Sequence, residues 1–188
     1  MKDQHFDTII RNGTVVHSQG TGITDIGIRG GKIAAIADHL SADAGTVIDA
    51  ESLLVLPGGV DTHCHIEQVS GAGLLNADTF ETATRSASIG GTTTVVSFAA
   101  QHPGHKMAQV VADYATLARR GAIIDYAFHM IVSDTGNGNL SEDIPALIDE
   151  NHRSIKIFTT YEKVRQDDKS ILDLLDLARD RDALVCFH

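Results

Sequence analysis

The sequence is poor in the features that mark several large classes of protein. It has two cysteines in 188 residues, too few for a disulfide framework. No apolar run approaches the roughly 20 residues of a membrane helix, and the first residues lack the apolar core of a signal peptide. The formal net charge of -10 argues against a basic surface for nucleic acid. We therefore expect a cytoplasmic protein that binds neither membranes nor nucleic acid.

Residues 1–56 show the pattern of a small β domain. Turns are expected at Asn12-Gly13 and Gly30-Gly31, and each should close a hairpin. The strands are too short to bury a good core alone, so a β-sandwich-like segment that packs on further chain is expected. The predicted strands are Phe6–Arg11, Thr14–His17, Thr24–Arg29, Lys32–Ile36, Val47–Ile48 and Leu53–Leu56.

From residue 57 onward, strands alternate with helices, which indicates an α/β fold with a parallel sheet and helices packed outside it. The predicted strands are Val60–His65, Thr93–Phe98, Ile123–Val132, Ser154–Phe158 and Leu184–His188. The four predicted helices begin at Asp78, Lys106, Glu142 and Asp168. Asp78 and Glu81 should form a capping box on the first helix, and Ser141 should cap the third.

About five strands in residues 57–188 are too few for a complete barrel, because a (β/α)8 TIM barrel usually takes roughly 250 residues. We therefore expect the N-terminal part of such a barrel, incomplete in this chain and continued in a longer protein. The domain boundary is predicted at residues 56 and 57.

Two histidines end the first predicted barrel strand, after the segment Pro57–Asp61. Because side chains alternate along a strand, His63 and His65 should point to one side and Cys64 to the other. Two imidazoles on one face can bind a transition metal. The alternative is a pair of histidines that happen to end a strand.

Lys156 is unusual because it lies within a central strand, where both faces should be covered. It could extend its amine beyond the strand end or pair with a carboxylate. Alternatively, a neutral amine there can add carbon dioxide, giving a carbamate whose two oxygens bridge two metal ions. His188 ends the last strand, at the rim that carries the active site in barrel enzymes. His63, His65, Lys156 and His188 should therefore converge on one rim.

These motifs resemble the amidohydrolase superfamily, in its branch of dihydropyrimidinases and D-hydantoinases. The segment Pro57–His65 is similar to the metal-binding start of that family. Ser154–Tyr161 is similar to its carboxylated-lysine strand, and Gly90–Thr94 matches the same branch. The similarity extends over nearly the whole chain.

The resemblance implies a site for two divalent metal ions, for which zinc suits the mixed nitrogen and oxygen ligands. His63 and His65 would bind one ion, His188 the second, and carboxylated Lys156 would bridge them. Hydroxide shared by the ions would attack the carbonyl of a small cyclic amide or imide and open its ring C–N bond. Tyr161 would donate a hydrogen bond to the substrate carbonyl.

Other candidate residues surround this set. Asp61 should brace the site through a hydrogen bond without binding metal. After His65, the segment Ile66–Gly73 differs from the pattern common in hydantoinases, which leaves the substrate open. Gln68 in that segment could contact substrate or could equally be a solvent-facing loop residue. His102 follows the second barrel strand, where it should lie near the rim and could contact substrate. His129, inside a strand, is expected to be a core histidine with its polar atoms satisfied.

The family's general base, an aspartate of the eighth strand, and a histidine of the sixth strand are absent from these residues. We therefore expect the 188-residue chain to be inactive alone, and the whole protein to be a homo-oligomer like its relatives. Allantoinases, dihydroorotases and phosphotriesterase-like hydrolases are alternatives with a similar metal cage. Non-catalytic scaffold proteins related to dihydropyrimidinase are another, but they lose ligands that are present here.

Overall fold

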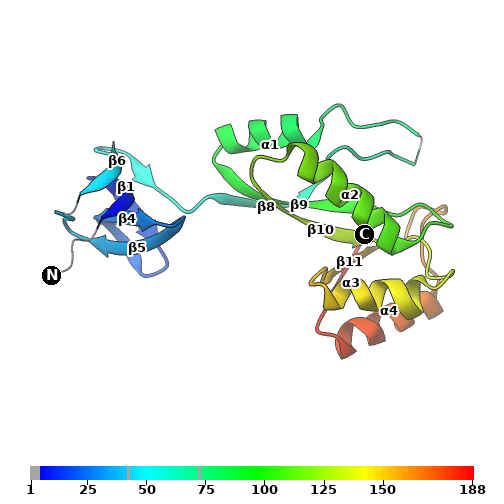
Figure 1. Ribbon diagram of the computed structural model, residues 1–188. Coiled ribbons are helices and arrows are strands. Elements are labelled where there is room, and N and C mark those ends of the chain that lie inside the picture. The colour runs from blue at the N-terminus through cyan, green and yellow to red at the C-terminus, as the bar shows by residue number, and fades with distance from the viewer. Residues whose placement is uncertain (1–4, 42, 72) are drawn as a thin grey trace. The chain divides into compact units, whose positions relative to one another are not determined.

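The computed structural model describes residues 5–41, 43–71 and 73–188. Contacts divide the chain into two compact units, Met1–Pro57 and Gly58–His188. In the described residues the first unit contains strands without helices, whereas the second alternates strands and helices (Figure 1). None of the described helices combines the length and the apolar character needed to span a bilayer.

The first unit contains two small β-sheets. Its strands are β1 (Phe6–Arg11), β2 (Thr14–His17), β3 (Gly20–Ile23), β4 (Asp25–Arg29), β5 (Lys32–Ala37), β6 (Ala44–Asp49) and β7 (Leu54–Val55). One sheet has the order β5-β4-β1-β6 and the other β3-β2-β7. Strands β4 and β5 are antiparallel and form the hairpin predicted across Gly30-Gly31. Both glycines have positive φ angles, 59° and 72°, which other residues adopt at a steric cost.

The hairpin predicted across Asn12-Gly13 is wrong, because this turn carries the chain from one sheet to the other. Strand β1 pairs with β4 and β6, while β2 pairs with β3 and β7. The Asn12 side chain donates to Asp49 Oδ1 at 2.9 Å, which holds the turn on the four-stranded sheet. A Cβ atom at Gly13 would lie 2.5 Å from Val55 Cγ2. The residues at positions 12 and 13 therefore serve contacts with more distant segments of the first unit, and they do not close a hairpin between β1 and β2.

The second unit is a five-stranded parallel sheet with helices between its strands. The strands are β8 (Gly59–Cys64), β9 (Thr92–Ala100), β10 (Asp125–Ile131), β11 (Ser154–Ile157) and β12 (Leu184–Phe187). The helices are α1 (Phe80–Ile89), α2 (Met107–Gly121), α3 (Ile144–Asp149), which follows the π-helix η1 (Asn139–Asp143), and α4 (Asp168–Asp180). Sheet order follows chain order, β12-β11-β10-β9-β8, so the predicted α/β alternation is confirmed. The sheet is curled (Figure 1).

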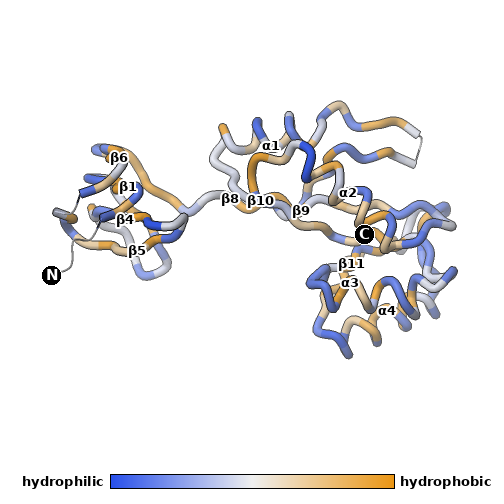
Figure 2. Tube along the Cα trace, in the orientation of Figure 1, coloured by the Kyte–Doolittle hydropathy of each residue, from blue (hydrophilic) through white to orange (hydrophobic). Residues whose placement is uncertain are grey.

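Helices α1 and α2 pack on the face of the sheet that carries Phe128. The Phe128 ring lies 6.2 Å from the ring of Phe80 in α1 and 6.2 Å from that of Tyr114 in α2. Phe80 is completely buried, and burial of such a side chain stabilises a fold by about 1.5–3 kcal/mol. In α4 the tube alternates between hydrophobic and hydrophilic residues (Figure 2), and its Leu174 and Ala178 are buried. The helices therefore cover one face of the sheet.

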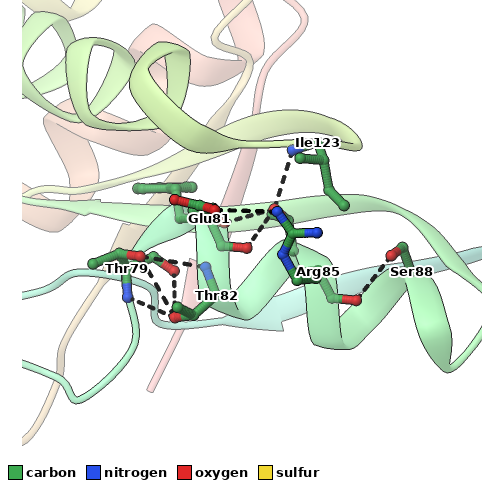
Figure 3. A network of polar contacts seen from close by, with 8 residues as sticks. Thr79, Glu81, Thr82, Arg85, Ser88 and Ile123 are labelled. Carbon is green, nitrogen blue, oxygen red and sulfur yellow. Dashed lines mark hydrogen bonds and ion pairs between the residues drawn. The ribbon is translucent and has the colours of Figure 1, made fainter.

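Helix α1 is capped one residue later than predicted. Thr79 is the N-cap: its hydroxyl accepts a hydrogen bond from Thr82 N–H at 3.3 Å, and Thr82 Oγ1 accepts one from Thr79 N–H at 3.0 Å (Figure 3). The predicted capping box of Asp78 and Glu81 is therefore wrong. Glu81 instead pairs with Arg85 one turn later, at 3.1 Å.

The third predicted helix begins later than expected. Residues Asn139–Asp143 form a π-helical turn, and the α-helix starts at Ile144, so the cap predicted at Ser141 is wrong. The Asn139 side chain is buried within this turn, and its Oδ1 accepts a hydrogen bond from Met107 N–H at 2.7 Å. Asn139 thereby supplies a partner for an N–H at the start of α2.

Candidate active site

The register of the parallel sheet decides which side chains share a face. Paired residues on neighbouring strands point to the same side. Cys64 pairs with Ser97, which is on the face covered by helices, so the adjacent His63 and His65 belong to the opposite face. On that opposite face, Phe98 pairs with His129.

The same register continues across the last two strands. Ile131 pairs with Lys156, and Lys156 pairs with Cys186. Ile131 lies two residues after His129, so Lys156 is on the face of His63 and His65. His188 lies two residues after Cys186 and follows it onto this face. The four residues predicted to bind metal thus share the face that the helices leave uncovered, near the carboxyl ends of their strands.

Phe98 forms a platform under the two histidines of β8 and its carboxyl end. Its ring centroid lies 5.0 Å from that of His63, at 69°, and 4.5 Å from that of His65, at 18°. The two imidazoles are 5.6 Å apart. Phe98 is 3% exposed, so the platform is held firmly by its surroundings.

His129 completes this aromatic group from β10. Its ring lies 5.0 Å from Phe98. Nδ1 is 2.6 Å from Ser154 Oγ, and Nε2 is 2.9 Å from the carbonyl oxygen of Thr62. Both ring nitrogens therefore have partners, which confirms the expectation of a satisfied histidine and ties β8, β10 and β11 together.

Lys156 is buried without a polar partner. It is 7% exposed, and its Nζ lies 5.6 Å from the ring centroid of Phe158, a cation–π distance. Across residues 5–41, 43–71 and 73–188, its amine makes no hydrogen bond or ion pair. The carboxylate pairing considered from the sequence is thus not present in the described residues.

His188 and Tyr161 lie together beside Phe158. His188 Nε2 is 3.2 Å from the Tyr161 hydroxyl, and the His188 ring is 5.3 Å from that of Phe158. Tyr161 has a φ of 60°, in the left-handed region that is uncommon for a residue with a large side chain. Its carbonyl accepts hydrogen bonds from Val164 and Arg165 N–H at 2.8 and 3.0 Å. These two bonds hold the strained turn that presents the hydroxyl.

The candidate ligands therefore fall into two groups of contacts, His63 and His65 around Phe98, and Lys156 and His188 around Phe158. In the described part of the chain, no three His, Cys, Asp or Glu side chains form a group that could hold a metal ion. A common cage of His63, His65, Lys156 and His188 stays a prediction. Sequence reasoning missed the role of Phe98 and Phe158, although the alternation of side chains along each strand places both of them on this face.

A cleft of about 660 Å³ lies between the loops that follow β8, β9 and β11. It brings together Gln68, His102 and Tyr161, the three residues predicted to contact substrate. The other lining residues are Val69, Gly71, Ala100, Gln101, Ile131, Phe158, Glu162, Lys163 and Val164. Because cofactor-sized and substrate-sized ligands bind in clefts of this volume, the loops form a candidate binding site.

Two polar side chains contact the histidines directly. Gln68 Oε1 lies 2.6 Å from His65 Nδ1. Asp61 Oδ1 accepts a hydrogen bond from the backbone N–H of His63 at 2.9 Å, so the contact of Asp61 is with the main chain of the histidine.

Cys64 lies between these histidines but on the other face. Burial and the charge of Asp61 raise the pKa of the Cys64 thiol to about 11, while a hydrogen bond with Ser97 acts in the opposite direction. The side chain of Cys64 lies on the helix-covered face, opposite the two imidazoles, so Cys64 is not a candidate ligand.

Comparison with known proteins decides the family. Residues 54–188 match the amidohydrolase family. The chain belongs to the amidohydrolase family. D-hydantoinases from Rhizobium radiobacter and Ralstonia pickettii are each 41% identical to this amidohydrolase chain over 183 residues, which cover 97% of the chain and 39% of each relative. The chain thus spans 39% of the length of these curated relatives.

Solved structures agree with this assignment. A structure of D-hydantoinase matches the amidohydrolase chain with a TM-score of 0.92 and 40% identity, covering 97% of this chain and 40% of the other. Dihydropyrimidinase from Brevibacillus agri NCHU1002 matches with a TM-score of 0.90 and 37% identity, over 96% and 39% of the two chains. The resemblance to the hydantoinase and dihydropyrimidinase branch is confirmed.

Proposed function

We propose that this chain is part of a metal-dependent enzyme that hydrolyses the ring C–N bond of a cyclic amide or imide, of the dihydropyrimidine or hydantoin type. The observation that carries the proposal is the buried, unpaired Lys156 on the same sheet face as three candidate histidine ligands. The names of the relatives support the substrate class. The curled sheet would be the first part of a (β/α)8 barrel, and the seven-stranded first unit part of a β-sandwich.

The side chains on this face fit a pair of divalent cations. A buried ammonium without a partner is costly, whereas addition of the free Lys156 amine to carbon dioxide would form an N–C bond, release a proton and give a carbamate anion with two donor oxygens. His63 and His65 would hold one cation and His188 the other, with the Lys156 carbamate shared between them. This mixed set of nitrogen and oxygen ligands suits zinc. When bound, such a pair of cations supplies an activated water and polarises the scissile carbonyl.

Tyr161 would orient the substrate from the cleft. Its side chain is 58% exposed, and its hydroxyl, held near His188, can donate a hydrogen bond to the carbonyl oxygen as negative charge develops there. Gln68 and His102 line the same cleft and would contact the ring or its substituent. Asp61 would fix the main chain of His63. The substrate would therefore lie between the strand ends and these loops.

We further propose that a second histidine ligand and the general base come from parts of the protein outside these 188 residues. The chain spans 39% of its curated relatives, so the activity belongs to the intact protein. A homo-oligomeric state and a cytoplasmic location stay predictions.

A single substitution tests the role of Lys156. Lys156→Met keeps the length of the side chain but removes the amine, so the metal content of the intact protein and its hydrolysis of dihydrouracil and hydantoin should both be lost. In the metal-free protein, thermal stability should not fall, because a buried unpaired amine is replaced by an apolar side chain. Lys169→Met is the matched control, since Lys169 is exposed and pairs with Asp173 in the same helix.

Metal analysis separates the enzyme from the scaffold alternative. Two ions per subunit in the intact protein, lost in Lys156→Met and retained in Lys169→Met, support the proposal. An intact protein that binds no ion when loaded with Zn²⁺ would refute it and favour a non-catalytic scaffold.

A further inference from the structure

The environment of His65 selects one of its two nitrogens. Nδ1 lies 2.6 Å from Gln68 Oε1, and a carbonyl oxygen can only accept a hydrogen bond. The proton of the neutral imidazole is therefore on Nδ1. Nε2 is then left with its lone pair, and it makes no hydrogen bond to any described residue.

The orientation of the same ring is restrained from two further sides. The imidazole stacks on Phe98, with centroids 4.5 Å apart and planes at 18°, so rotation out of that plane breaks the stack. The His65 carbonyl accepts a hydrogen bond from Asn76 Nδ2 at 3.0 Å, which holds the backbone. The one alternative orientation that keeps the stack is the ring turned by 180° about its Cβ–Cγ bond. The hydrogen bond to Gln68 disfavours that orientation, because the turn would move Nδ1 away from Oε1.

We propose that Gln68 is a positioning residue that holds His65 in the Nδ1–H tautomer and so keeps Nε2 ready to bind a cation. The proposal rests on the proposed function, in which His65 is a ligand. It adds a role for a residue of the segment in which this chain departs from the pattern common in hydantoinases. A histidine ligand whose other nitrogen donates to a fixed oxygen is better oriented and more basic, and loss of such a partner typically weakens metal binding by about 10- to 100-fold.

Gln68 also connects this histidine with the cleft. Its side chain lines the same cleft of about 660 Å³ as His102 and Tyr161, while its Oε1 is committed to His65. A substitution of Gln68 therefore changes the hydrogen bond to His65 and the lining of the cleft at the same time. A test of the positioning role must therefore measure the tautomer of His65 as well as turnover.

Nuclear magnetic resonance of the metal-free intact protein measures the tautomer, because ¹⁵N shifts distinguish the protonated from the unprotonated nitrogen of each imidazole. In the wild-type protein, His65 should show protonated Nδ1 and unprotonated Nε2. Gln68→Met removes the acceptor and should move the population toward the Nε2–H tautomer. Gln68→Glu restores an acceptor oxygen and should restore the wild-type pattern. His129 is the internal control, because both its nitrogens have partners other than Gln68.

Titration of the metal-free intact protein with Zn²⁺ alone forms the second arm. The dissociation constant should rise about 10-fold or more in Gln68→Met and return toward the wild-type value in Gln68→Glu. An unchanged His65 tautomer, or equal Zn²⁺ affinity in all three proteins, overturns the positioning role. If the tautomer shifts as expected but the wild type binds no Zn²⁺, the metal site of the proposed function is overturned and Gln68 orients a histidine that is not a ligand.

Discussion

Replacement of Phe98 by leucine should separate the stability of the sheet from the order of the candidate ligands on its open face. Phe98 is 3% exposed and its ring contacts those of His63, His65 and His129 at 4.5–5.0 Å. Substitution of a buried phenylalanine by alanine costs about 3–5 kcal/mol; leucine keeps part of the volume, so we expect about 1.5–2.5 kcal/mol of lost stability.

The effect on metal binding follows from the two ring contacts with candidate ligands. Each aromatic pair contributes about 0.5–1.5 kcal/mol beyond its buried area. Loss of the contacts to His63 and His65 should therefore cost about 1–3 kcal/mol of ligand preorganisation, which corresponds to a rise of roughly 5- to 150-fold in the Kd for Zn²⁺. Urea denaturation measures the first quantity, and competition with a chromophoric chelator measures the second.

Phe128→Leu is the matched control. Phe128 is 4% exposed on the neighbouring strand, but its ring packs on Phe80 and Tyr114, on the helix-covered face. It should lose a similar amount of stability and keep its affinity for Zn²⁺. Equal Zn²⁺ affinities in Phe98→Leu and Phe128→Leu would refute the idea that the platform orders the two histidines.

Three further outcomes are expected. Thr79→Ala removes the N-cap of α1 and should lower the free energy of unfolding by about 1 kcal/mol, whereas Thr116→Ala, at an exposed position within α2, should change it by less than about 0.5 kcal/mol; equal effects would contradict the cap. Half-burial lowers the pKa of His152, with Glu150 opposing, so its contribution to stability is present above the unfolded pKa and is lost as pH falls through the lower folded value. His152→Gln should therefore weaken the loss of stability on acidification in urea titrations, and an unchanged pH profile would count against this. The 188-residue chain supplied with Zn²⁺ should not hydrolyse dihydrouracil or hydantoin, and measurable turnover would disprove the need for residues beyond it.

The shared face of the candidate ligands was predictable because it depends on local rules. Alternation along a strand places His63 opposite Cys64, and parallel strands with helical connections bring Lys156 and His188 to the same side. These relations need only the strand assignment, which periodicity supplies. The sheet face that carries the candidate ligands was therefore predictable from the sequence.

Contacts between distant segments were not accessible in this way. Asn12-Gly13 has the residues of a hairpin turn, yet its partners Asp49 and Val55 lie far along the chain. These tertiary contacts, and not the local sequence, determine that the turn connects two sheets. In the sequence Phe98 cannot be distinguished from other apolar strand residues. Its contacts with His63 and His65 depend on how β8 and β9 pair. Gln68 contacts His65 because the chain turns sharply at Glu67, where φ is 51°. A glutamate at this position does not predict a left-handed backbone.

The left-handed backbone of Tyr161 would set the stability of the fold against the proposed contact with substrate. Glycine adopts a φ of 60° without the steric cost that a tyrosine carries there. Laboratory evolution toward heat resistance alone should therefore drift to Tyr161→Gly and discard the hydroxyl. Selection that also demands turnover should keep the aromatic side chain and its strain together.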